Sequence, residues 1–232
     1  MPGRRHLPFR DHQITVLLIL YLIALAPADI SAQEKRSGAA YSSSNPIHVD
    51  GVLDESAWTS APVIAGFRQK DPHEGEASTE STEIRILYTS KSFFLAIRCF
   101  DSEPDRVLAT ELRRDNEFTN DDSVSILLDT LHDHRNAFLF RVNPHGKQYD
   151  ALITDEGRIV DVNWDESWKS AAKIDPSGWS VEVEIPFRAL RLSGSKEQVW
   201  GIDFERVIRR KSEFTYWSNY RRGFDFIKCI FL

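Results

Sequence analysis

Cysteine is scarce in this sequence, with two residues among 232, Cys99 and Cys229. Neither belongs to a Cys-x-x-Cys pair or to a cluster with histidine, so no thiolate zinc site is predicted. Cys99 lies in the apolar run 95–100, which is typical of a strand, and we expect it to be a small core residue. The spacing of the two cysteines does not decide whether they form a disulfide.

Long runs of positive charge are also missing. The chain has 29 Lys and Arg against 35 Asp and Glu, a net charge of −6, and its basic clusters, 209–211 and 221–222, are short. Binding to a nucleic-acid backbone depends on a positive field that this composition does not supply. We therefore expect no nucleic-acid partner, whereas a neutral polysaccharide needs no such field.

The motifs of several enzyme classes are absent: there is no GxSxG, HExxH, phosphate loop or dinucleotide fingerprint. His132 and His134 lie one residue apart in a polar loop and are expected to be exposed. A glycosidase needs two carboxyl groups facing a cleft, and no pattern pairs the many carboxylates of this chain. Glu182 and Glu184, on one face of a predicted strand, are expected to form a solvated surface. We predict no catalytic residues.

The first 33 residues have the plan of a secretory signal peptide. Arg4, Arg5 and Arg10 make a positive start, residues 14–25 are apolar, and small residues follow. The apolar run is about half of the ~20 residues that span a bilayer, so a membrane-anchored N-terminus is the weaker alternative. We expect an exported protein in the periplasm, at the outer membrane or secreted, and a small polar linker over 34–46.

Beyond the linker the dominant period is two, which predicts strands. Helical signals are restricted to short pieces within 54–58, 101–113 and 186–190. Many short strands separated by turns predict an all-β protein, an antiparallel β-sandwich with a few short helices. The expected strands are 82–88, 92–100, 123–128, 137–142, 147–154, 167–174, 179–185, 200–208 and 214–217.

Six tryptophans give the chain aromatic surface on which sugar rings can stack. Trp58, Trp179 and Trp200 stand in apolar company and are expected in the core. Trp164 and Trp217 stand in polar stretches and are expected to be more exposed, with packing at the rim as the alternative.

Five blocks of sequence occur in a characteristic order. They are 49–58 (VDGVLDESAW), 122–129 (DSVSILLD), 140–143 (FRVN), 178–187 (GWSVEVEIPF) and the closing pair 200–204 (WGIDF) with 216–218 (YWS). These blocks resemble the family 9 carbohydrate-binding modules, whose opening pattern is roughly DGxxDExxW. We assign 47–225 to such a module. The resemblance implies an immunoglobulin-like or jelly-roll-like β-sandwich that binds sugar ends between two aromatic rings, often with structural calcium.

The resemblance also implies which residues bind sugar. Arg141 and Asn143 match polar residues of the family's site, Gln148 fits a further polar ligand, and Phe118 falls near the first stacking aromatic. Ser125 stands where sugar binders carry glutamate. The predicted ligand-binding set is Phe118, Arg141, Asn143, Gln148, Trp164 and Trp217. Asp101 and Asp122 are hard-cation ligands by residue type only, and no calcium is assigned to them.

In particular, the sequence resembles the module that precedes an outer-membrane β-barrel region in large bacterial proteins of unknown function. We expect such a region as a C-terminal partner outside this chain, and 226–232 as a truncated tail. The leading hypothesis is a non-catalytic module that binds an oligo- or polysaccharide in carbohydrate catabolism. The alternative is a periplasmic interaction domain of a barrel protein with a decayed sugar site. A third, weaker reading is part of a glycoside hydrolase.

Overall fold

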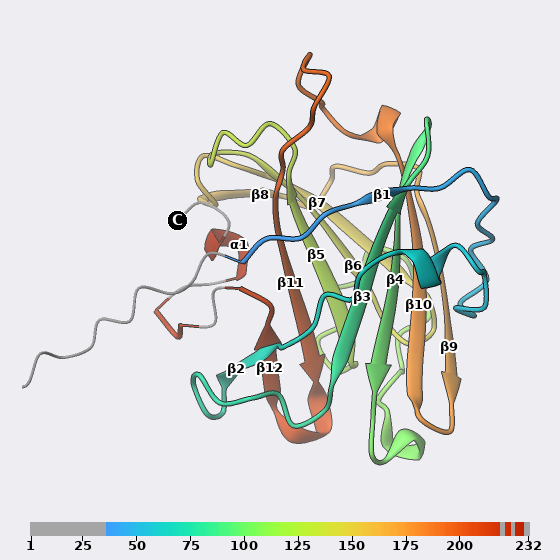
Figure 1. The fold of residues 1–232 in the computed structure, drawn as a ribbon. Coiled ribbons are helices and arrows are strands. Elements are labelled where there is room, and N and C mark those ends of the chain that lie inside the picture. The colour runs from blue at the N-terminus through green and yellow to red at the C-terminus, as the bar shows by residue number, and fades with distance from the viewer. Residues whose placement is uncertain (1–35, 219–220, 224–225, 230–232) are drawn as a thin grey trace, which may run out of the picture. The chain divides into compact units, whose positions relative to one another are not determined.

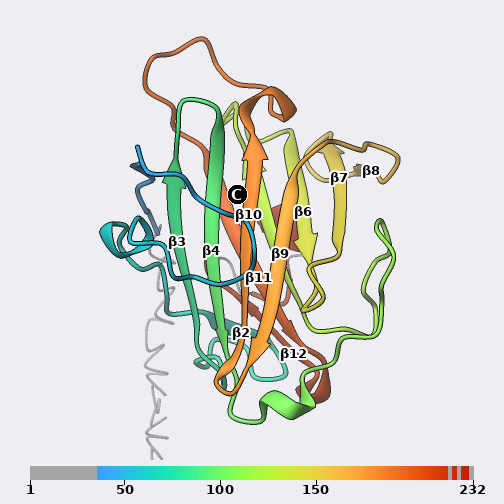
Figure 2. The same cartoon turned by 90° about the vertical axis from the view of Figure 1, so that its right-hand side faces the viewer.

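The strands of this chain pack as two sheets facing each other (Figures 1 and 2). The structure is a computed structural model, and it describes residues 36–218, 221–223 and 226–229. The predicted signal peptide, 1–33, lies outside the described residues. All strand neighbours are antiparallel except β1 and β3, which are parallel. The predicted antiparallel β-sandwich is confirmed.

The five-stranded sheet has the order β1-β3-β4-β10-β9 and the seven-stranded sheet the order β2-β12-β11-β5-β6-β7-β8. In the first sheet the bounds are β1 Tyr41–Ser42, β3 Thr82–Tyr88, β4 Ser92–Phe100, β10 Gly178–Pro186 and β9 Lys169–Asp175. In the second they are β2 Arg68–Asp71, β12 Glu213–Tyr216, β11 Gly201–Ile208, β5 Ser123–Asp129, β6 Ala137–Val142, β7 Gln148–Thr154 and β8 Ile159–Asp161.

Helices are short. Four 3-10 turns, η1 Trp58–Ser60, η2 Pro104–Arg106, η3 Phe187–Ala189 and η4 Arg209–Lys211, accompany the single α-helical turn α1 Phe226–Cys229 in the described part of the chain. No helix among the described residues is long and apolar enough to cross a membrane.

Each of the nine expected strands forms within two residues of both predicted ends. Three further strands were not expected. β1 lies inside the segment 34–46 that we predicted to be a linker, and β2 and β8 have no apolar alternation to reveal them. The predicted tail begins with α1, where Phe226 is buried against the seven-stranded sheet.

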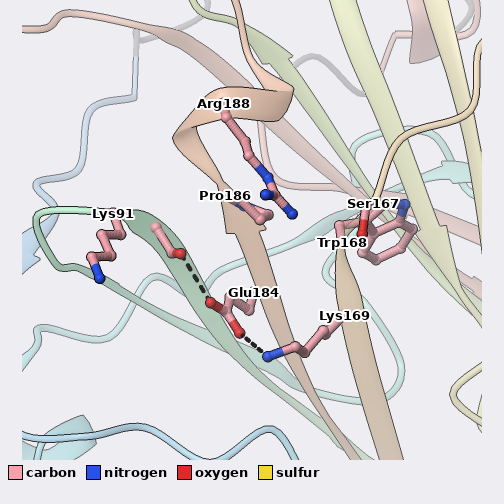
Figure 3. A pocket seen from close by; sticks show the side chains of 8 residues that line it. Lys91, Ser167, Trp168, Lys169, Glu184, Pro186 and Arg188 are labelled. Atoms are coloured by element: carbon pink, nitrogen blue, oxygen red, sulfur yellow. Dashed lines mark hydrogen bonds and ion pairs between the residues drawn. The ribbon is translucent and has the colours of Figure 1, made fainter.

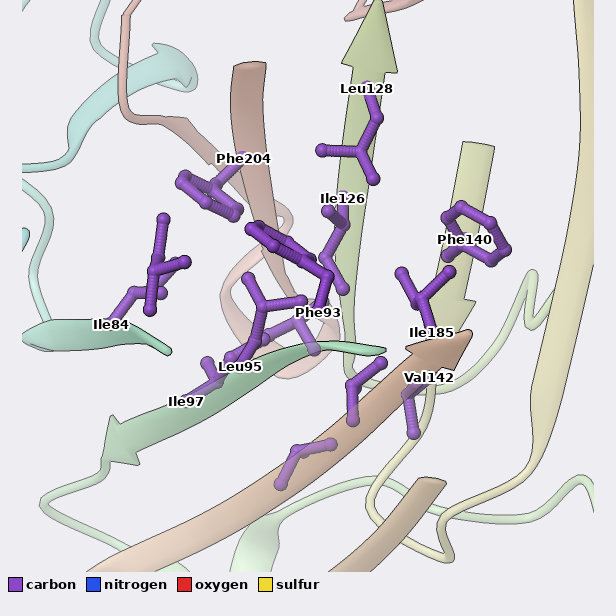
Figure 4. Close-up of a cluster of buried hydrophobic side chains, with 14 of the residues drawn as sticks. Ile84, Phe93, Leu95, Ile97, Ile126, Leu128, Phe140, Val142, Ile185 and Phe204 are labelled. Atoms are coloured by element: carbon purple, nitrogen blue, oxygen red, sulfur yellow. The ribbon is translucent and has the colours of Figure 1, made fainter. Parts of the chain in front are cut away.

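The main core lies between the sheets, where alternate residues of the facing strands meet (Figure 4). Cys99 is fully buried in this core, as expected, and burial raises the pKa of its thiol to about 11. The inner face of the seven-stranded sheet contributes Val124, Ile126, Leu128, Phe138, Phe140, Val142 and Phe204, and that of the five-stranded sheet Ile84, Phe93, Leu95, Ile97, Val181, Val183 and Ile185.

A buried ionic cluster closes one end of the sandwich. The Arg210 guanidinium makes two hydrogen bonds of 2.7 Å to the Asp101 carboxylate and a 3.3 Å contact with Glu80. Arg206, fully buried, donates to the backbone carbonyls of Ser81 and Phe100 at 2.8 and 2.7 Å. Because Arg206 comes from β11 and both carbonyls from the β3–β4 side, the cluster ties the two sheets together.

The outer face of the five-stranded sheet holds the segment 49–58, the first block of the family-like sequence. Glu182 of β10 accepts hydrogen bonds of 3.0 Å from the backbone N–H groups of Asp50 and Gly51 and from the indole N–H of Trp58. Trp58 also donates to Glu55 at 3.0 Å. We call this arrangement the Glu182 clasp. Glu182 is fully buried, so the expectation that it forms a solvated surface is wrong.

Gly51 lets the clasp form. Its φ of 88° belongs to the left-handed region, where a side chain is strained. A Cβ at this position would lie 2.8–2.9 Å from backbone atoms of Ala172 in β9. The segment therefore approaches the sheet at a distance that only glycine permits.

Candidate functional site

One row of side chains crosses the outer face of the seven-stranded sheet. In the strand register Tyr149 of β7 lies opposite Arg141 of β6, Arg141 opposite Ser125 of β5, Ser125 opposite Glu205 of β11, and Glu205 opposite Tyr216 of β12. Residues directly opposite each other share a face of the sheet, and the neighbours of these residues point into the main core. We call these five residues the Arg141 row.

The centre of the Arg141 row is a charged, hydrogen-bonded chain. Nε of Arg141 donates to Oγ of Ser125 at 2.8 Å, and Ser125 donates to Oε2 of Glu205 at 2.9 Å. Nη2 of Arg141 lies 3.6 Å from the same carboxylate. The side chain of Arg141 is 22% exposed, so solvent reaches a guanidinium that is otherwise fixed by its neighbours.

Aromatic rings flank this charged centre. The guanidinium carbon of Arg141 lies 5.6 Å from the ring centre of Tyr149, and burial raises the pKa of that tyrosine. On the other side Tyr216 packs against Phe226 of α1, with ring centres 5.3 Å apart. Phe118 joins the same buried cluster and is 2% exposed. Arg141 also contacts the loop that contains Phe118, because its Nη1 donates to the backbone carbonyl of Glu117 at 3.3 Å.

Asn143 is a buried loop-forming residue. Its Nδ2 donates to Oδ2 of Asp121 and to the carbonyl of Glu111, both at 2.8 Å. Its Oδ1 accepts the backbone N–H groups of His145 and Lys147 at 3.1 and 2.9 Å. The side chain is completely shielded from solvent and its amide is used within the chain.

Gln148 points to the opposite side of β7 from Tyr149, because successive strand residues alternate between faces. Its Oε1 accepts a 2.8 Å hydrogen bond from Arg114, and its Nε2 donates to the carbonyl of Trp168 at 3.1 Å. Arg114 also donates to Asp150 at 2.9 Å. Burial raises the pKa of Asp150.

The two tryptophans of the predicted site do not reach the Arg141 row. Trp217 is 5% exposed and packs in the main core, with its ring centre 5.9 Å from that of Phe204, so the expectation of exposure is wrong. Trp164 is half-buried, with its ring centre 5.1 Å from that of Phe138 at the edge of the core. Of the six predicted ligand-binding residues, the structure brings together Arg141 and the loop of Phe118.

Sequence reasoning missed Glu205, Tyr149 and Tyr216. Each lies in a strand that was correctly predicted, but its place in the row depends on strand register, which the sequence pattern does not specify. For Glu205 the paired strands, β5 and β11, are also far apart in the sequence. Ser125 was singled out only as a departure from the family.

A separate cavity of about 390 Å³ lies beside the C-terminal end of β10 (Figure 3). Glu184 is at its centre and accepts 2.9 Å hydrogen bonds from Ser92 and from the Lys169 ammonium. Arg188 and Trp168 also line it. The charged side chains that line the cavity are therefore mainly cationic, with one carboxylate. The Arg141 row instead contains one arginine and one glutamate.

The two acidic residues considered for calcium do not fit a cation. Asp101 is held by the guanidinium of Arg210. Asp122 accepts the backbone N–H of Arg209 at 2.8 Å, and burial raises the pKa of its carboxyl to about 6 although Arg206 and Arg210 oppose this rise. A calcium ion here would face the positive charge of these arginines. These two residues therefore do not form a calcium site.

The family can be decided from the sequence blocks that this fold brings together. A model of the family described as carbohydrate family 9 binding domain-like matches residues 49–213. The chain belongs to this family. Its first block, 49–58, and its fourth, 178–187, are joined in the structure by the Glu182 clasp.

Solved structures share the fold of this family 9 domain at low sequence identity. A protein of Bacteroides uniformis ATCC 8492 has a TM-score of 0.61 and 13% identity, over 74% of this chain and 83% of that one. A family 9 carbohydrate-binding module of Caldicellulosiruptor kristjanssonii in complex with glucose has a TM-score of 0.55 and 17% identity, over 78% and 90%. The same kind of module in complex with cellotriose has a TM-score of 0.53 and 17% identity, over 78% and 88%. No curated protein matches the chain.

Proposed function

We propose that this family 9 domain binds carbohydrate, without cleaving it, at the Arg141 row. The observation that carries the proposal is the chain of Arg141, Ser125 and Glu205, with Tyr149 beside it, on one face of the seven-stranded sheet. Sugar hydroxyl groups both donate and accept hydrogen bonds, and they are met here by a guanidinium donor and a carboxylate acceptor.

A sugar would contact this site at the exposed part of the Arg141 side chain. Its Nη2 is 3.6 Å from Glu205, longer than a good charge-assisted hydrogen bond, so this nitrogen retains donor capacity. Tyr149 is buried, and its ring supports the guanidinium of Arg141 from one side. Neighbouring hydroxyl groups of a pyranose would contact the guanidinium and Glu205 together.

The first ligands to test are glucose and cellotriose, which family 9 modules of the same fold hold in their solved complexes. Isothermal titration calorimetry on the folded domain measures the affinity for each sugar. We expect Arg141→Ala to weaken binding at least tenfold, because a hydrogen bond to a charged group contributes about 1.5–3 kcal/mol. Arg141→Lys, which keeps the charge but loses the fork of donors, should weaken it less.

The matched control is Arg188→Ala, which removes an exposed arginine from the Glu184 cavity instead. It should leave the affinity unchanged, with thermal unfolding showing that every variant is folded. Loss of binding in Arg188→Ala but not in Arg141→Ala would move the site to the cavity. Absence of heat with a broad panel of mono- and oligosaccharides would reject carbohydrate binding.

A second candidate function is an interaction domain within a larger exported protein that carries an outer-membrane barrel region. The burial of Phe118 and Trp217, both expected to contact sugar, favours this alternative. The same titrations separate the two functions, because an interaction domain with a decayed site gives no heat with sugars.

We also propose export of the chain, supported by the signal-like pattern of residues 1–33. Cell fractionation with and without those residues tests this proposal.

A further inference from the structure

The loop that joins β5 to β6 (Figure 1) carries side chains of the types that ligate transition metals, and these lie close together. Asp129 ends β5, and His132 and His134 follow in the loop. One ligating atom from each of these three residues lies within 4.8 Å of the others, the one such group among the residues that the structure describes. The imidazole ring centres of the two histidines are 4.7 Å apart.

The backbone of this loop fixes the Asp129 carboxylate beside the two histidines. The carboxylate of Asp129 is buried and accepts the backbone N–H groups of Asp133 and His134 at 3.2 and 2.9 Å. These bonds use one lone pair on each carboxylate oxygen and leave others for a ligand. His132 and His134 both adopt left-handed conformations, with φ of 51° and 56°, and their ring centres lie 4.7 Å apart.

His132 has a buried polar atom without a partner. Its Nδ1 is shielded from solvent and makes no hydrogen bond. A buried nitrogen in this condition destabilises the folded state unless a hydrogen bond or a metal satisfies it. The side chain therefore has an unused polar atom inside a group whose other members are metal ligands by type.

We propose that Asp129, His132 and His134 form a binding site for a first-row divalent transition metal, with Zn²⁺ as the ion that fits best. Imidazole nitrogen and carboxylate oxygen bind Zn²⁺ at about 2.0–2.2 Å, and three protein ligands leave the fourth tetrahedral position to water. Tetrahedral bonds of that length place ligand atoms about 3.4 Å apart. The ligand atoms of the three residues now lie within 4.8 Å of one another, so a bound metal would draw all three side chains closer together.

The chemistry of the donors separates this site from a calcium site. Ca²⁺ takes six to eight oxygen ligands, and two of the three donors here are nitrogen. The three ligands lie close together in the sequence, as Asp-x-x-His-x-His. A bound metal would therefore stabilise the loop between β5 and β6. The site is independent of the Arg141 row, because the two share no residue.

Titration calorimetry of tag-free protein with ZnCl₂ tests the proposal, with CaCl₂ as the second probe. We expect one Zn²⁺ per chain, no heat with CaCl₂, and a rise in the thermal unfolding temperature with ZnCl₂. His134→Ala and His132→Ala should each weaken Zn²⁺ binding at least tenfold. His73→Ala, an exposed histidine outside the loop, should bind as the unchanged protein does.

Co²⁺ provides a spectroscopic signal that nonspecific binding to the protein surface does not give. Co²⁺ in a site of low coordination absorbs visible light strongly, and the band should disappear in the His132→Ala, His134→Ala double variant. The proposal is overturned if the unchanged protein binds no Zn²⁺, or if the double variant binds it with unchanged affinity while remaining folded by circular dichroism.

Discussion

Replacement of Glu182 by glutamine should remove a specific pH dependence from the stability of this domain. The Glu182 carboxyl is fully buried at the centre of the clasp and is met by neutral N–H donors. Burial raises its pKa to about 7, against the opposing effect of those hydrogen bonds, and the nearby Glu55 carboxylate adds to the rise. Glu182→Gln keeps the size and one oxygen acceptor of the side chain but cannot ionise.

The sign and size follow from proton linkage. Between the ordinary pKa of 4.5 and the folded value of about 7, the folded state holds the Glu182 proton more tightly than the unfolded state does. The stabilisation is therefore complete below pH 4.5 and is lost as pH rises through 7. The difference between 4.5 and about 7, at about 1.36 kcal/mol for each pH unit, makes the loss roughly 3 kcal/mol.

The measurement is urea unfolding of both proteins from pH 4 to pH 8, followed by circular dichroism. Subtraction of the two free energies of unfolding removes the other titrating groups that both proteins share, Asp122 among them. We expect the original chain to lose roughly 3 kcal/mol relative to Glu182→Gln across this range. A difference that stays constant with pH, or that changes in favour of the original chain, would show that the three N–H donors outweigh burial and would refute the reasoning.

Gly51→Ala should destabilise the domain by about 2 kcal/mol or more in urea unfolding, since the new Cβ meets the Ala172 backbone from a left-handed conformation. Gly194→Ala, where no atom lies within 4 Å of the new Cβ, should change stability by less than about 0.5 kcal/mol, and equal effects of the two would contradict this account. Arg210→Ala should cost about 3–5 kcal/mol, because it removes the two guanidinium hydrogen bonds of the buried Asp101 carboxylate and leaves a 3.8 Å contact with Arg206 as its ion pair. Thermal unfolding that is unchanged in Arg210→Ala would show that the pair of Arg210 and Asp101 does not stabilise the domain.

Strands with regular alternation were predictable because one of their faces is buried. Val181, Val183 and Ile185 of β10 show this pattern, and all three are in the main core. The opposite face of the same strand was not predictable, because a separate segment covers Glu182. β8, whose three residues are all exposed, has no buried face to impose a pattern.

The candidate site was predictable only in part. Arg141 could be found from the family pattern, but Glu205 enters the row through the pairing of β5 with β11, which are far apart in the sequence. Trp217 was misjudged from its polar neighbours in the chain. Its ring lies on the inner face of the sheet against Phe204, and alternation places adjacent residues on opposite sides whatever their polarity.

The Glu182 clasp has a consequence for how members of this family are recognised. In this chain the opening pattern DGxxDExxW and the glutamate of the GWxxE block are partners in one structural joint, on the sheet opposite to the Arg141 row. Selection for a stable fold is enough to preserve that joint, whether or not a ligand is ever bound. A search that gathers sequences by this signature therefore collects domains with a common scaffold, and their ligands have to be sorted by residues such as Arg141 and Glu205 that the signature does not include.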